Sequence, residues 1–121
     1  MADFEAVAAR LREVLAPYRR PLKPGEHTGI ELLLGRPTPA YPEGQQFAGI
    51  RVGKRYVSFY LTPVYMWPDL LDSVSPGLRR RMQGKSCFNF TSIDEGLMGE
   101  LEGLTASAFD RFRAEGFVPA G

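Results

Sequence analysis

Apolar side chains recur at helical spacing in the first fifteen residues of the chain. Successive members lie three or four positions apart, which places them on one face of an α-helix: Phe4, Val7, Ala8, Leu11 and Leu15. Asp3 is well placed as the N-cap, and Pro17 marks the end of the pattern. We therefore expect an amphipathic N-terminal helix with its apolar stripe turned toward the core.

The middle of the chain has the alternation of a two-stranded hairpin. In QQFAGIRVGKRYVSFYLTP, Gly53-Lys54 supplies the glycine that a type II′ turn requires, and this turn predicts pairing of Val52 with Arg55. One face of that hairpin is wholly apolar: Ala48, Ile50, Val57, Phe59 and Leu61. The other face collects Phe47, Gly49, Arg51, Tyr56, Ser58, Tyr60 and Thr62. The hairpin is thus expected to cover a core with one face only.

Shorter patterns complete the order of elements. IELLL indicates a strand after the turn-rich linker PLKPGEHTG, and KSCFNFT indicates another. Two short helices precede the latter, PDLLDSV and PGLRRRMQ, with Ser75 as N-cap of the second and Gly84 as its stop. A helix from Ile93 to about Glu115 closes the chain, with a capping box of Ser92 and Glu95 and a break near Gly103.

Composition bounds the class of protein. The chain has 121 residues, which suits a single domain over residues 1–121. Fifteen basic residues nearly balance fourteen acidic ones, so net charge indicates neither a nucleic acid nor a membrane as partner. The N-terminal segment MADFEAVAARLREVL has no uninterrupted apolar run of signal-peptide length, and we expect a cytoplasmic protein.

The chain offers few residues for metal or cofactor chemistry. Its one cysteine and one histidine exclude an internal disulfide and the usual zinc ligand sets. The acidic residues show no metal-ligand spacing, and GRPTPAYPEG lacks the pattern of a phosphate-binding loop. We expect no metal, no cofactor and no catalytic residue, and a non-enzymatic role is favoured.

Strand alternation separates Cys87 from its neighbours. Phe88 and Phe90 are expected to join the core, while Cys87 and Asn89 point to the opposite face. On that face they would meet Tyr56, Ser58 and Tyr60, an aromatic and polar mixture that is unusual for a surface exposed only to water. Three interpretations of Cys87 stay open: a packed small side chain, a lining residue of a ligand site, or a reactive thiol.

The leading hypothesis is a binding module with a pocket on this face. Trp67 and its neighbours would close one end, and Lys85 would supply charge for a small anionic or aromatic ligand, or for a peptide. The predicted ligand-binding residues are Tyr56, Ser58, Tyr60, Trp67, Lys85, Cys87 and Asn89. A thiol-dependent enzyme or redox sensor using Cys87 is the alternative, although His27 lies in a linker that nothing brings to the thiol.

Three segments carry a family resemblance. YVSFYL, SPGLRRRMQGKSCFNF and LTASAF resemble the YdhG-like family of small bacterial domains of unknown function, a superfamily that includes a proposed frataxin-like iron chaperone. The resemblance covers Gly53 to about Phe112. It implies an α+β fold, with an antiparallel sheet backed by the N- and C-terminal helices and two short helices inserted before the last strand.

Iron handling and self-association are the remaining expectations. Frataxin-like iron binding relies on clustered carboxylates, whereas the acids Asp3, Glu5 and Glu13 of the first helix are diluted by arginines. Iron delivery is therefore a minor hypothesis. The proline-rich loop from Gly35 to Gly44 is apolar enough to serve as a contact in a homodimer.

Overall fold

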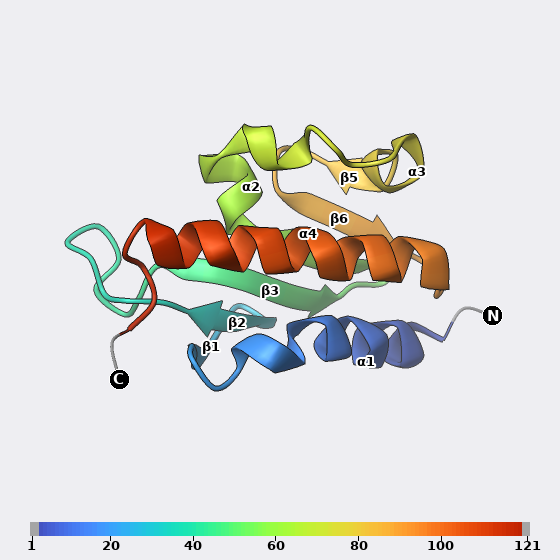
Figure 1. Ribbon diagram of the computed structural model, residues 1–121. Coiled ribbons are helices and arrows are strands. Elements are labelled where there is room, and N and C mark those ends of the chain that lie inside the picture. The colour runs from blue at the N-terminus through green and yellow to red at the C-terminus, as the bar shows by residue number, and fades with distance from the viewer. Residues whose placement is uncertain (1–2, 120–121) are drawn as a thin grey trace.

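Two long helices lie on one face of a six-stranded antiparallel sheet in the computed structural model, which describes residues 3–119 (Figure 1). The strand order is β1-β2-β3-β4-β6-β5. The strands are β1 (Lys23–His27), β2 (Ile30–Leu34), β3 (Gln46–Val52), β4 (Val57–Leu61), β5 (Met82–Gln83) and β6 (Cys87–Phe90). The helical elements are α1 (Phe4–Leu15), η1 (Ala16–Tyr18), α2 (Thr62–Met66), η2 (Pro68–Leu71), α3 (Pro76–Arg79) and α4 (Glu95–Ala114). The predicted α+β architecture is confirmed.

The core fills the space between this sheet and the helices α1 and α4. The α1 side chains at the predicted spacing are buried from Val7 onward, and Phe88 and Phe90 of β6 point into the same core. Asp3 caps α1 as expected, because its carboxylate accepts a hydrogen bond from the Ala6 N–H at 3.0 Å. The predicted inward face of the hairpin is confirmed, since its five members are at most 1% exposed.

The predicted turn of the β3–β4 hairpin is wrong. Val52 pairs with Val57 rather than with Arg55, so the loop spans the four residues 53–56. The Gly53 N–H donates to the carbonyl of Tyr56 at 3.0 Å across this loop. The real register differs from the predicted one by two residues. Because side chains alternate with a period of two, this shift by itself moves no strand residue to the opposite face.

Phe47 is the exception to the predicted sorting of faces. It was expected on the polar face, but it is fully buried in the core. The register between β2 and β3 shifts at this point, from Leu33 opposite Ala48 to Leu34 opposite Gln46, which is a β-bulge. The bulge turns Phe47 inward beside Ala48, where its ring packs 5.2 Å from that of Phe112.

Four local predictions are also corrected. The segment expected to be a linker forms β1, joined to β2 by a two-residue turn with positive φ at both Thr28 and Gly29, 48° and 80°. Asp94 rather than Ser92 caps α4, accepting from the Leu97 N–H at 3.1 Å, and α4 runs unbroken through Gly103. The second short helix ends at Arg79, well before Gly84.

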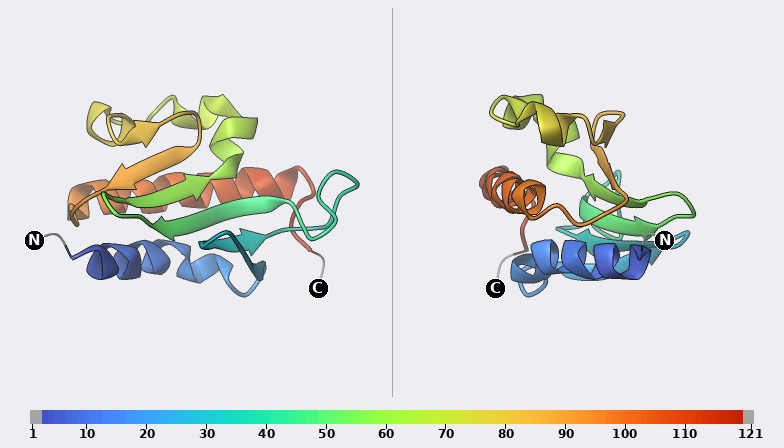
Figure 2. Two further views of the ribbon diagram at one scale, coloured as in Figure 1. Left: turned by 180° about the vertical axis from the view of Figure 1, so that it is seen from behind. Right: turned by 90° about the vertical axis from the view of Figure 1, so that its right-hand side faces the viewer.

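The remaining helical segments form an insert at one edge of the sheet. α2, η2 and α3 connect β4 to β5 and contact α4 (Figure 2). Among residues 3–119 no helix covers the sheet face opposite α1 and α4, and we call this the open face (Figure 2). None of the helices within residues 3–119 has the length and hydropathy needed to cross a membrane.

Candidate functional site

The open face gathers most of the predicted site residues. Tyr60 pairs with Cys87 and Ser58 with Asn89, so these four side chains share the face as predicted. Their polar groups bond mainly to one another. The Ser58 hydroxyl and the Cys87 thiol both donate to Oδ1 of Asn89, at 2.7 and 3.3 Å. Ser58 is only 5% exposed although no helix lies over it.

Gln83 of β5 connects this network to Tyr56, the fifth predicted residue on the open face. The Asn89 amide donates to Oε1 of Gln83 at 2.7 Å, and the Tyr56 hydroxyl donates to the same oxygen at 3.3 Å. Sequence reasoning did not select Gln83, because a two-residue strand carries too short an alternation to be recognised. The open face is therefore a surface with an internally bonded polar layer.

Cys87 lies half-buried in this layer. Burial raises the pKa of its thiol, and the polar neighbour Ser58 offsets only part of that effect. The histidine that could activate it, His27, belongs to β1, four strand positions away in the sheet and thus about 19 Å distant. These surroundings are those of a packed thiol and not of an activated nucleophile.

Trp67 and Lys85 lie apart from the open face. The Trp67 ring packs against α4, with the Arg111 guanidinium 5.0 Å from its centroid and the Phe117 ring at 6.2 Å. Lys85 lies in the short connection between β5 and β6, where its ammonium is 5.8 Å from the centroid of Tyr65. The structure therefore brings together five of the seven predicted residues and separates the other two.

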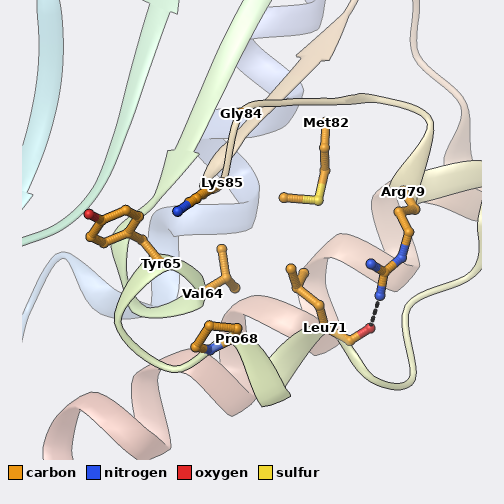
Figure 3. Close-up of a pocket in the computed structure, with 8 residues that line it drawn as sticks. All are labelled: Val64, Tyr65, Pro68, Leu71, Arg79, Met82, Gly84 and Lys85. Carbon is orange, nitrogen blue, oxygen red and sulfur yellow. Dashed lines mark hydrogen bonds between the residues drawn. The ribbon is translucent and has the colours of Figure 1, made fainter.

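Lys85 instead lines a cavity beside the helical insert, which we call the insert cavity. Its volume is about 620 Å³, within the range of small-molecule sites. The lining comes from α2 and η2 on one side and from α3, β5 and the β5–β6 connection on the other (Figure 3): Val64, Tyr65, Pro68, Leu71, Arg79, Met82, Gly84 and Lys85.

The insert cavity combines an apolar floor with two cations. Arg79 and Lys85 stand on opposite sides of it, with the side chains of Val64 and Met82 between them (Figure 3). The Arg79 guanidinium is held by a hydrogen bond from Nη2 to the carbonyl of Leu71 at 2.7 Å. No carboxylate is among the lining residues. Such a site suits an anion that has an apolar or aromatic body.

The described residues form no candidate metal site, and they line further cavities. Within residues 3–119, no three or more His, Cys, Asp and Glu side chains are grouped so that they could hold a metal ion. A second cavity of about 510 Å³ lies between the β1–β2 hairpin and the proline-rich loop, where exposed Tyr41 and His27 line it. A third, of about 530 Å³, lies at the tip of the β3–β4 hairpin.

Comparison of the chain with protein-family models, with curated proteins and with solved structures found no match. The resemblance to YdhG-like domains thus stays a prediction.

Proposed function

We propose that the protein is a non-enzymatic binding module whose insert cavity takes a small organic anion with an aromatic or apolar body. The observation that carries this proposal is the placement of Arg79 and Lys85 over a floor without acidic groups. Among residues 3–119 neither cation takes part in an ion pair, so both are available to a carboxylate, sulfonate or phosphate.

The apolar lining of the insert cavity favours a ligand with an apolar or aromatic body. Val64 is 1% exposed and forms part of the apolar floor, while Tyr65 is 59% exposed and presents a ring at the rim. A flat ligand body can stack on this ring, which already attracts the Lys85 ammonium. This proposal moves the expected pocket from the open face to the insert, since the polar groups of the open face are largely satisfied by one another.

The test is a pair of isosteric probes. Naphthalene-2-carboxylate and naphthalene-2-carboxamide are titrated into ¹⁵N-labelled protein, and amide shift changes are mapped. We expect the carboxylate to shift residues that line the insert cavity and to bind about tenfold more tightly than the carboxamide, as a charge-assisted hydrogen bond contributes about 1.5–3 kcal/mol. Lys85→Gln and Arg79→Gln should each reduce this preference.

Lys54→Gln is the matched control, because Lys54 is an exposed lysine at the tip of the β3–β4 hairpin and does not line the insert cavity. Equal affinity for both probes, or the same loss in the control as in Lys85→Gln, would refute the proposal. A shift pattern centred on any other surface would refute it too.

The other functions expected from the sequence stay predictions. The thiol-dependent alternative gains no support from a cysteine whose pKa is raised, and the iron hypothesis gains none from the described carboxylates. A peptide ligand, a homodimer through the proline-rich loop and a cytoplasmic location also remain expectations from the sequence alone.

A further inference from the structure

Charge is strongly segregated within this nearly neutral chain. All eight ion pairs of residues 3–119 use arginines of the two long helices: Arg10, Arg12, Arg111 and Arg113. The segment 45–93 holds seven basic residues and only two acidic ones, Asp69 and Asp72. Asp69 is already paired with Arg111 of α4. The part of the molecule that carries the open face therefore has a local excess of positive charge.

Two of these cations mark the ends of one row across the open face. Arg51 pairs with Ser58, and Ser58 pairs with Asn89. The Asn89 N–H donates to the carbonyl of Arg81 at 2.8 Å, which continues the β5–β6 pairing by one residue. By strand alternation Arg51 and Arg81 point to the same side as Ser58 and Asn89. Three strand spacings, about 14 Å, separate the two arginines.

The adjoining row supplies an aromatic ring. Tyr60 lies between Gly49 and Cys87, so its ring has a neighbour without a side chain on one flank. Tyr56 lies two residues before Ser58, at the end of the hairpin loop, and its hydroxyl donates to Gln83. Beyond it, Lys54 and Arg55 form the hairpin tip, which projects away from α4 (Figure 2).

We propose that the open face binds a single-stranded nucleic acid. Exposed sheets with aromatic side chains stack about two or three unpaired bases, and cations beside the rings hold the phosphates. Here Tyr60 and Tyr56 provide the ring surfaces, and Arg51, Arg81 and the hairpin tip provide the charge. Gln83, whose amide oxygen is engaged in the polar layer, keeps its amide N–H groups as donors for base edges.

This charge distribution selects a polyanion over the other occupants of a sheet face. A net charge of +1 led to the expectation of no nucleic-acid partner, but net charge averages the helix layer with the open face. The partly exposed rings of Tyr56 and Tyr60 favour unpaired bases over a duplex, whose base planes are inaccessible.

The test measures fluorescence anisotropy of labelled 12-nucleotide RNA and DNA single strands, and of a 12-base-pair duplex, in 50 and 200 mM salt. We expect single strands to bind better than the duplex and to weaken with salt. Tyr60→Ala should weaken binding about tenfold with little change in salt dependence. The double variant Arg51→Gln/Arg81→Gln should reduce the slope of log affinity against log salt by about 1.4.

The matched control is Arg19→Gln/Arg20→Gln, which removes the same charge from an exposed pair after α1. Photocrosslinking of unmodified protein to a 4-thiouridine strand gives a second measurement, and the crosslink should map to the peptides of Tyr56 and Tyr60. No binding at 50 mM salt, equal losses in both double variants, or preference for the duplex would overturn the proposal. Binding of polyglutamate in place of oligonucleotides would assign the face to an acidic peptide and overturn it as well.

Discussion

Adjacent residues of β6 experience opposite surroundings. Phe88 is fully buried between the sheet and the long helices, whereas Cys87 is half-buried on the open face. Its thiol bonds to Asn89, and burial keeps its pKa above the ordinary value. Cys87 is thus a half-buried, hydrogen-bonded member of the polar layer.

Substitutions at these two positions should differ sharply in cost. Phe88→Ala is expected to reduce the free energy of unfolding by about 3–5 kcal/mol, because it empties a buried aromatic site. Cys87→Ser should cost about 1 kcal/mol, since serine can keep the hydrogen bond to Asn89. Urea unfolding followed by circular dichroism measures both. Equal, large losses would show that the thiol is sealed in the core and would contradict the half-buried placement.

At the scale of elements, α4 is the longest helix although it contains three glycines. Gly96, Gly99 and Gly103 all lie on its exposed side, and a side chain at Gly99 or Gly103 would meet no atom within 4 Å. Gly35, just after β2, is the opposite case. A Cβ there would collide with the carbonyl oxygen of Phe117 and with the ring of Phe112.

Alanine should therefore have opposite effects at these glycines. Gly99→Ala and Gly103→Ala are each expected to stabilise the protein by about 0.5–1 kcal/mol, through the higher helix propensity of alanine. Gly35→Ala should destabilise it by about 1–3 kcal/mol, because neither the backbone oxygen nor the packed ring can move freely. Thermal unfolding of the three variants compares them directly. A stabilised Gly35→Ala variant would mean that the C-terminal segment does not pack as the structure shows.

At the scale of the whole molecule, ion pairs join the layers on the helix side. The Arg10 guanidinium bonds to Glu95 at the start of α4, at 3.0 Å, and the Arg12 guanidinium bonds to Glu31 of β2 at 2.6 Å. Hydrogen bonds from these arginines lower the pKa of Glu95 and of Glu31. The carboxylates of Glu31 in β2 and Glu95 in α4 are thereby ionised more readily in the folded chain than in the unfolded one.

This linkage predicts an acid-sensitive fold. As pH falls below the ordinary glutamate pKa of about 4.3, the unfolded chain takes up protons first, so the stability contributed by these pairs is present above that pH and is lost below it. Arg10→Gln and Arg12→Gln should lower the urea midpoint at pH 7. Between pH 7 and pH 3 the midpoint of these variants should decrease less than that of the unaltered protein. Arg113→Gln, which removes an exposed pair with Asp110, is the control and should keep the original slope. Parallel pH curves for all variants would contradict the linkage.

Local patterns were sufficient for much of the architecture. The α1 stripe, the Asp3 cap and the inward Phe88 and Phe90 follow from spacing, since amphipathic periodicity reflects burial directly. The hairpin faces were also predictable despite the wrong turn, because a two-residue shift preserves alternation. The burial of Phe47 was not predictable from the sequence. It results from a bulge, and a bulge depends on pairing with the neighbouring strand β2, which is a separate segment of the sequence.

The candidate sites depended more on tertiary structure. Alternation in sequence determined that Cys87 and Asn89 face away from the core, and strand pairing then placed Ser58 and Tyr60 beside them. The insert cavity arises only when η2 and α3 fold against β5, which brings Leu71 to the Arg79 guanidinium. The basic row of the open face likewise joins residues from separate strands. Sequence by itself determined which side chains are buried within α1, β4 and β6, since that follows from local period, whereas the burial of Phe47 in β3 depended on the bulge opposite β2. Tertiary structure alone decided which exposed side chains meet, because such meetings depend on pairing and packing between distant segments.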